Sequence, residues 1–154
     1  MKTKGQKGFT LIELMVAVII AIILLLATGT VLFIAQISWN NAWQKVNLQR
    51  DSSYAMLKMS HSIKAASSAT IDDDGKAIKI YGEGGTWTTF FLGQESKALI
   101  CQIEGQYPEV VVNGRVEDLA FNVEGSKVGI DLKLKEANLQ THLASTVMMR
   151  NYGG

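Results

Sequence analysis

The feature that most limits how this chain can fold is an apolar run near its N-terminus. Leu14–Ala35 is a stretch of 22 residues that only Thr28, Gly29 and Thr30 interrupt. An α-helix rises about 1.5 Å per residue, so such a run reaches about 33 Å, which matches the thickness of a bilayer core. The sequence therefore predicts a helix embedded in a membrane or in the apolar core of a filament.

The flank that precedes this run is basic. Lys2, Lys4 and Lys7 come before Phe9 with no acidic residue among them, although the whole chain carries a net charge of only +1. Because basic residues stay on the cytoplasmic side of a membrane, this flank predicts a cytoplasmic N-terminus and an extracytoplasmic remainder. The small net charge provides no large basic surface, and we expect no nucleic-acid partner.

Glu13 lies near the start of the apolar run, and the possible interpretations of the N-terminus differ in how well they explain this carboxylate. A conventional signal peptide would be cut near Ala27-Thr28-Gly29 and would release a soluble periplasmic binding domain. Its apolar region would then begin with a carboxylate and continue past the cut, which is unusual for such peptides. A plain membrane anchor explains the length of the run but not Glu13, because a charge inside a bilayer is costly unless it is paired.

Residues 7–16, KGFTLIELMV, resemble the class III signal of type IV pilins and type II secretion pseudopilins. In that family a prepilin peptidase removes a short basic leader after a glycine and N-methylates the new first residue. The resemblance implies that the cut falls between Gly8 and Phe9 and that Phe9 is methylated. It also implies that Glu13, at the fifth mature position, pairs with the N-terminal amine of a neighbouring subunit during assembly. A buried charge is tolerable when it is paired in this way.

The same resemblance implies a domain organisation and a set of partners. Residues 1–8 would be the cleaved leader, residues 9–35 a transmembrane or filament-core helix, and residues 36–154 an extracytoplasmic globular pilin-like domain. The expected partners are other minor and major pilin-like subunits, the prepilin peptidase and N-methyltransferase, an inner-membrane assembly platform and, before assembly, the lipid bilayer.

Within the family, the chain looks like a minor pseudopilin or minor pilin of the PilW/J type. Arg50-Asp51 in the expected helix and Arg150-Asn151 near the C-terminus fit that type. The single cysteine, Cys101, excludes the intramolecular disulfide that many major pilins carry. No acidic cluster follows Glu136, unlike the calcium loop of major pseudopilins, and Glu13 is present, unlike in the tip subunit. These features predict a position just below the fibre tip.

The region after the apolar run is expected to continue the helix, because no proline occurs before Pro108. We expect one helix from about Thr10 to about Ser67, apolar in its first half and amphipathic in its second, with a weak point at Thr28-Gly29-Thr30. Spacings of three and four define the face expected to lie on a sheet: Trp39, Trp43, Val46, Arg50, Tyr54, Leu57 and His61. Trp39 and Trp43 are expected to anchor at the membrane interface, and His61 is expected at the surface or packed rather than catalytic.

The C-terminal half alternates apolar and polar residues between turn signals, which is typical of short strands. The expected strands are residues 77–81, 86–92, 98–103, 109–112, 116–123 and 127–135, and a last one that begins near Leu139. In the last two, Val128, Ile130, Leu132, Leu134, Leu139, Leu143, Val147 and Met149 are expected to face inward. The predicted fold class is α+β, with a long N-terminal helix packed on a C-terminal antiparallel β-sheet.

Motifs that could carry chemistry do not meet the spacing that the chemistry needs. Asp72-Asp73-Asp74-Gly75 lacks the alternating ligands and distant glutamate of a calcium loop, and is expected to be a turn. Gly82-Glu83-Gly84-Gly85 lacks the Lys-Ser/Thr of a phosphate-binding loop and is expected to connect a hairpin. Cys101 is expected to be a small buried residue. We expect no metal, no cofactor and no catalytic residue, so that a membrane-anchored periplasmic enzyme is disfavoured.

Overall fold

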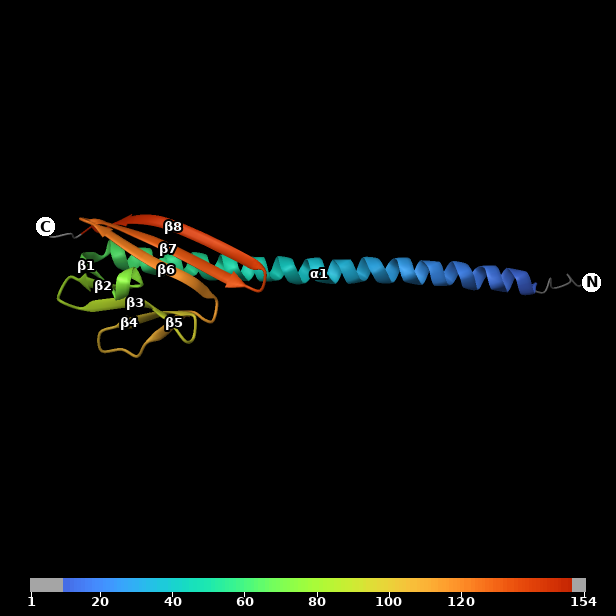
Figure 1. Cartoon of the computed structure of the whole chain (residues 1–154), viewed down its shortest axis with the longest axis horizontal. Coiled ribbons are helices and arrows are strands. Elements are labelled where there is room, and N and C mark those ends of the chain that lie inside the picture. Colours follow the sequence, from blue (N-terminus) through green and yellow to red (C-terminus); the bar gives the residue numbers. More distant parts are fainter. Residues whose placement is uncertain (1–9, 151–154) are drawn as a thin grey trace, which may run out of the picture. The chain divides into compact units, whose positions relative to one another are not determined.

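The computed structural model describes residues 10–150 of the chain (Figure 1). In that part, one long helix, α1 (Leu11–Lys64), is followed by eight strands and a short 3-10 turn, η1 (Asp73–Gly75). The strands are β1 (Ala66–Asp72), β2 (Ala77–Gly82), β3 (Trp87–Gly93), β4 (Ala98–Ile103), β5 (Glu109–Val112), β6 (Val116–Glu124), β7 (Lys127–Glu136) and β8 (Leu139–Met148). The predicted α+β arrangement, a long N-terminal helix followed by antiparallel strands, is confirmed.

The strands form two sheets where the sequence predicted one. The first sheet has the order β1-β2-β3-β4-β5, the second has the order β6-β7-β8, and every pair of neighbours is antiparallel. Buried residues of both sheets and of α1 belong to one apolar core, among them Phe90 of β3, Leu132 of β7 and Met59 of α1. The described chain divides between Trp43 and Gln44 into two compact units, and this core belongs to the second.

The beginning of the strand region differs from the prediction. The helix was expected to reach about residue 67 and the strands to start at about residue 77, but α1 ends at Lys64 and β1 already occupies Ala66–Asp72. The segment is rich in alanine and serine, which gives it little intrinsic strand preference. Its conformation comes from tertiary pairing with β2, which overrides local propensity.

The face of α1 that packs on the sheets also differs from the prediction. The expected face, from Trp39 to His61, is exposed along its whole length. The helix instead buries a face without aromatic or charged side chains: Leu48, Ser52, Ala55, Met56, Met59 and Ile63. Ser52 is accommodated because its hydroxyl donates a hydrogen bond of 2.9 Å to the Gln49 carbonyl. The helix was correctly expected to be amphipathic, but the face assigned to the core was wrong.

The strands after β1 lie where the alternation of apolar residues placed them. Val128, Ile130, Leu132 and Leu134 of β7 are all buried, and so are Val147 of β8 and the following Met149. Leu139 and Leu143 of β8 are half-buried and pack against the same core. Cys101 is only 2% exposed, as expected for a small core residue, and burial raises the pKa of its thiol.

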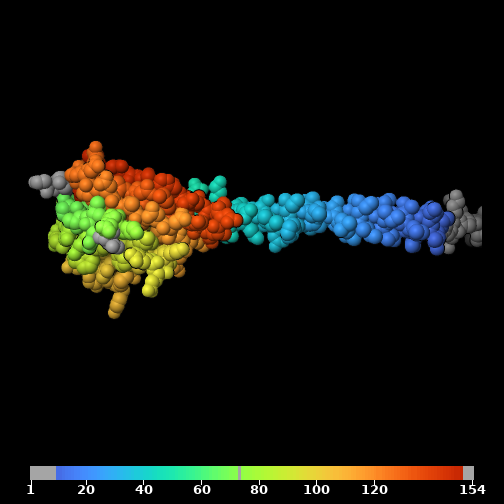
Figure 2. Space-filling model, in the orientation of Figure 1, coloured from blue at the N-terminus to red at the C-terminus, as the bar shows by residue number. Residues whose placement is uncertain are grey.

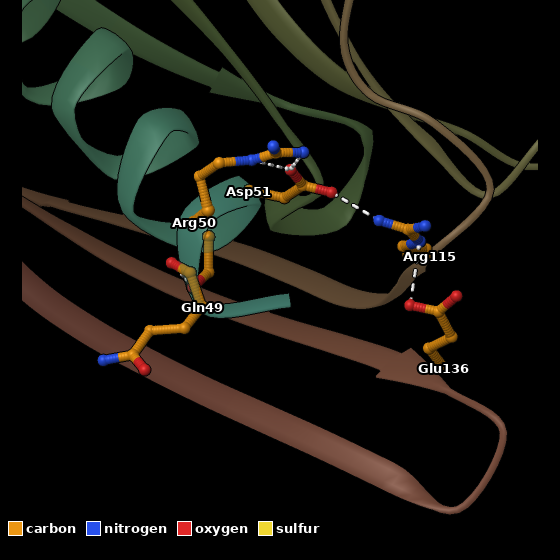
Figure 3. Close-up of polar contacts among 6 residues, drawn as sticks. Gln49, Arg50, Asp51, Arg115 and Glu136 are labelled. Carbon is orange, nitrogen blue, oxygen red and sulfur yellow. Dashed lines mark hydrogen bonds and ion pairs between the residues drawn. The ribbon is translucent and has the colours of Figure 1, made fainter. Parts of the chain in front are cut away.

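A polar cluster joins α1 to the loops at one end of the sheets (Figure 3). Arg115, between β5 and β6, places Nη1 2.6 Å from Oδ2 of Asp51 on α1. Its Nε lies 3.2 Å from Oε2 of Glu136 at the end of β7, an ion pair without the angle of a hydrogen bond. Arg50 approaches the other oxygen of Asp51 at 3.2 Å, but its side chain is 72% exposed. From its place just before β6, Arg115 thus links α1 to the end of β7.

Candidate processing and assembly segment

The residues predicted to take part in processing and assembly lie at the start of the chain. Gly8 and Phe9 lie outside the described residues, so the cleavage site and the methylation at Phe9 remain predictions. The described part begins at Thr10, and Glu13 lies in the first turn of α1.

Glu13 and Thr10 hydrogen-bond to each other at the N-terminus of the helix. Oε2 of Glu13 accepts hydrogen bonds of 2.9 Å from the backbone N–H of Thr10 and of 2.9 Å from its hydroxyl. In return, the Thr10 hydroxyl oxygen accepts a hydrogen bond of 3.4 Å from the backbone N–H of Glu13. This reciprocal arrangement is a capping box, which satisfies N–H groups that the first helical turn leaves without partners.

The capping box gives Glu13 a role within its own chain that the sequence analysis missed. The signal was present in the sequence, because Thr10-Leu11-Ile12-Glu13 has the Thr-x-x-Glu spacing of a capping box before an apolar run. Both bonds from Thr10 go to Oε2, and within residues 10–150 no hydrogen bond reaches Oε1 of Glu13. The carboxylate is therefore oriented by its own chain through one of its two oxygens.

The helical segment that follows is apolar on all sides. Every residue of α1 from Leu11 to Trp43 is exposed in the single chain, and its most apolar 18-residue window has a mean hydropathy of 2.9. A helix that is apolar all round requires an apolar environment, such as lipid or neighbouring helices. By length and composition, this part of α1 is able to cross a membrane.

The two threonines in the apolar run are compatible with such an environment. The Thr28 hydroxyl donates a hydrogen bond of 2.5 Å to the Leu24 carbonyl, and the Thr30 hydroxyl donates one of 2.8 Å to the Ala27 carbonyl. Because both donors are satisfied within the helix, they add little cost in lipid. α1 continues without interruption through Gly29, the point where the composition is least favourable to a helix.

Other residues considered for chemistry are not brought together. His61 is exposed on α1, whereas Cys101 is buried in β4. Among the described side chains of residues 10–150, which do not include that of Asp73, no three His, Cys, Asp or Glu side chains lie close enough together to hold a metal ion. The segment that stands out in the described part is therefore the N-terminal part of α1, a surface suited to association.

Comparison with known proteins bears on this same segment. Residues 3–29 match the model of the prokaryotic N-terminal methylation motif. The chain carries this class III signal. Together with the long helix and the antiparallel sheets, the class III signal is consistent with a type IV pilin-like protein, a structural class rather than an enzymatic one. The match includes the residues predicted for cleavage, methylation and assembly, and it ends at Gly29 within the apolar run. No curated protein and no solved structure matches the chain.

Proposed function

We propose that the chain is a non-enzymatic structural subunit, a minor pseudopilin or minor pilin. In this proposal it assembles with other pilin-like subunits near the fibre tip and helps to initiate a type II secretion pseudopilus or a type IV pilus. The observation that carries the proposal is a class III signal at residues 3–29 that continues into an exposed helical segment, apolar on all sides.

Before assembly, the precursor is held in the inner membrane by residues 9–35, with the domain from residue 36 onward outside the cytoplasm. The prepilin peptidase cuts between Gly8 and Phe9 and methylates the new amine. The apolar surface of α1 then exchanges lipid for the helices of neighbouring subunits. This exchange replaces one apolar environment by another, so the direction of assembly must come from specific polar contacts and close packing.

Glu13 provides such a polar contact in this proposal. Its Oε2 is oriented by Thr10, and Oε1 is available to the N-terminal amine of a neighbouring subunit. The pairing satisfies two charges that would otherwise be costly in the fibre core, and it sets the axial register of one subunit against the next.

The assignment as a minor subunit is the finer part of the proposal. Support comes from the resemblance of Arg50-Asp51 to the PilW/J type and from the presence of Glu13, which the tip subunit lacks. In the structure Asp51 forms an ion pair with Arg115, so Asp51 connects α1 to the segment before β6 in the globular domain. A single cysteine also fits a minor subunit better than a disulfide-closed major pilin.

The mature N-terminus tests the proposal directly. We expect the membrane-bound protein to begin with N-methylated Phe9, as measured by intact mass and N-terminal sequencing. Gly8→Leu should leave the precursor uncut, because the peptidase requires a small residue before the bond that it breaks. Gly5→Leu, in the same leader but away from the cut, is the matched control and should be processed normally.

Two results would contradict the proposal. A mature chain that begins near Thr30 would indicate a conventional signal peptidase and a released periplasmic domain. A Gly8→Leu chain with the normal mature mass would remove the class III processing step.

A further inference from the structure

α1 contains one glycine, Gly29, and the conformation of the chain does not require it. Glycine is among the least favourable residues in the interior of a helix, so alanine or leucine would favour α1 more. A glycine is needed where the backbone is left-handed or where a side chain would collide with a neighbour. Gly29 lies within a continuous helix, and a Cβ atom built on it meets no heavy atom within 4 Å apart from the adjoining helix backbone. The space beside Gly29 is therefore open in the single chain.

The absent side chain leaves a notch in the surface of the apolar run, which we call the Gly29 notch. It has a volume of about 410 Å³ and is lined by Leu25, Leu26, Gly29, Thr30, Phe33 and Ile34. All six residues are exposed. Figure 2 shows the side chains of this part of α1, in blue, at the surface of the face displayed. The notch is thus open to whatever surrounds the helix.

The chemistry of the Gly29 notch restricts its occupant to an apolar group. Its one polar side chain is Thr30, whose hydroxyl already donates a hydrogen bond of 2.8 Å to the Ala27 carbonyl. No charged residue occurs between Glu13 and Lys45. A charged group placed in the notch would find neither a counter-charge nor a free hydroxyl donor, so its burial there would be unfavourable.

Two kinds of apolar group surround a membrane helix: lipid chains and the side chains of other helices. Lipid chains are flexible and adapt to a smooth helix surface as well as to a notched one, so they give no reason for a glycine. Packing between helices does give one, because small residues let a second helix approach the backbone closely. Since lipid is as apolar as the helices, such close packing is a main source of their affinity for one another.

We propose that the Gly29 notch receives a large apolar side chain from the N-terminal helix of a neighbouring pilin-like subunit. The inference rests on the proposed function, which supplies the neighbour, and adds the point on α1 where the two helices approach most closely. The match to the N-terminal methylation motif covers residues 3–29 and so extends to Gly29. A neighbour with the same signal enters the membrane with its N-terminus on the cytoplasmic side, so the two helices run parallel.

Gly29→Leu separates the needs of the single chain from those of the neighbour. Within the chain, leucine meets no obstacle, favours the helix and makes the run more apolar, so the variant should stay helical and membrane-embedded. In the assembly, the leucine side chain fills the notch and holds the neighbouring helix away.

Ala35→Leu is the matched control, because it adds bulk to the same apolar run outside the notch. Ala35 lies six residues after Gly29, about 120° away around the helix axis, and does not line the notch. A contact made at the notch should tolerate this substitution.

Photo-cross-linking in cells that contain the fibre machinery measures the contact. Phe33 lines the notch, and benzoylphenylalanine in its place is a close structural substitute. The same probe at Val31 is the reference, because Val31 is 66% exposed and Phe33 67%, but Val31 does not line the notch. Products are isolated through a tag on the full-length chain and identified by mass spectrometry. We expect the probe at Phe33 to capture a protein that carries a class III signal.

Each substitution is then combined with each probe. Gly29→Leu should lower the yield of this product several-fold at Phe33 and leave the yield at Val31 unchanged, whereas Ala35→Leu should leave both unchanged. Lipid adducts alone at Phe33, a captured protein without a class III signal, no product, or an equal effect of Gly29→Leu at both positions would each overturn the proposal. So would a yield at Phe33 that Gly29→Leu does not lower, or that Ala35→Leu lowers equally.

The intact mass of the same chains distinguishes a failure of this inference from a failure of the proposed function. Methylated Phe9 at the N-terminus of every variant, without the effect of Gly29→Leu, would overturn the notch contact alone. A wild-type chain that is not cut after Gly8 would overturn the proposed function, and this inference with it. A Gly29→Leu chain that stays uncut beside a cut wild-type chain would assign Gly29 to the peptidase and overturn the notch contact.

Discussion

At the scale of single residues, Glu13 combines two roles that substitutions are able to separate. The structure shows it as the acceptor of a capping box with Thr10, whereas the proposed function requires its negative charge for a neighbour. Glutamine also serves in a capping box but carries no charge, and leucine provides neither property. If the charge sets the register of assembly, Glu13→Gln and Glu13→Leu should be equally defective.

The assay for this prediction is co-purification of neighbouring pilin-like subunits, together with fibre or secretion activity. Cleavage after Gly8 should remain intact in both variants, since the role of the charge follows processing. Thr10→Val is the matched control, because it removes the capping hydroxyl and keeps the charge. Normal assembly of Glu13→Gln beside a defective Glu13→Leu would show that Glu13 acts by capping alone.

Asp51 is the residue on which the polar cluster depends. Asp51→Ala removes the acceptor of the 2.6 Å contact with Arg115, whose side chain is 29% exposed. Hydrogen bonds to charged groups contribute about 1.5–3 kcal/mol when buried, and partial solvation here reduces the expected loss of unfolding free energy to about 1–2 kcal/mol. Thermal unfolding followed by circular dichroism measures this loss.

Arg50→Gln provides the comparison for that measurement. Arg50 approaches the same carboxylate, but its side chain is 72% exposed, so the substitution should change the unfolding free energy by less than about 0.5 kcal/mol. Equal losses for Asp51→Ala and Arg50→Gln would mean that the cluster with Arg115 adds no stability.

At the scale of elements, the orientation of α1 about its own axis yields a direct prediction. Met59 is fully buried against the sheets, whereas Leu57 is 70% exposed on the opposite face. Met59→Ala should lower the unfolding free energy by about 2–5 kcal/mol, as expected for a large-to-small change in a core. Leu57→Ala should change it by less than about 0.5 kcal/mol. A larger loss for Leu57→Ala than for Met59→Ala in a denaturant titration would mean that the face predicted from the sequence is the buried one.

The sequence predicted the elements of this fold better than their packing. The strands from β2 to β8 were recognisable because Val128, Ile130, Leu132 and their counterparts alternate with polar residues, and this period directly reflects burial on one side of a sheet. The face of α1 was misassigned because Trp43 and Leu57 are larger than Ala55 and Ser52. The buried face combines these two small residues with Leu48, Met56, Met59 and Ile63, and the large apolar residues of the other face drew the prediction away from it.

For the N-terminal segment, the sequence predicted the membrane-length helix and the class III signal but not the polar contacts. The apolar run and the basic flank identified a membrane-length helix, and the class III signal was readable from KGFTLIELMV. The bonds between Thr10 and Glu13 are local and follow a known spacing, so they too were predictable. The contact between Asp51 and Arg115 was not, because it joins residues 64 positions apart and depends on how the two sheets meet.

At the scale of the whole molecule, the two units of the chain depend on different environments. The apolar run of α1, which ends at Ala35, has only exposed residues in the single chain, so it needs lipid or other subunits. The unit from Gln44 onward contains the apolar core, and its first buried residue is Leu48. Stability of the globular unit should therefore be separable from insertion and assembly.

This separation predicts that a fragment comprising residues 36–154 is soluble and folded. It keeps every buried residue of α1 and the Asp51–Arg115 contact, and it lacks the apolar run. A single domain of this size is expected to unfold in one cooperative transition, with coincident curves from circular dichroism and tryptophan fluorescence. A fragment comprising residues 53–154 is the comparison, because it loses Leu48, Asp51 and Ser52. It should unfold at a clearly lower denaturant concentration. If the longer fragment shows no cooperative transition, or if the two fragments are equally stable, the C-terminal half of α1 is not an integral part of the globular core.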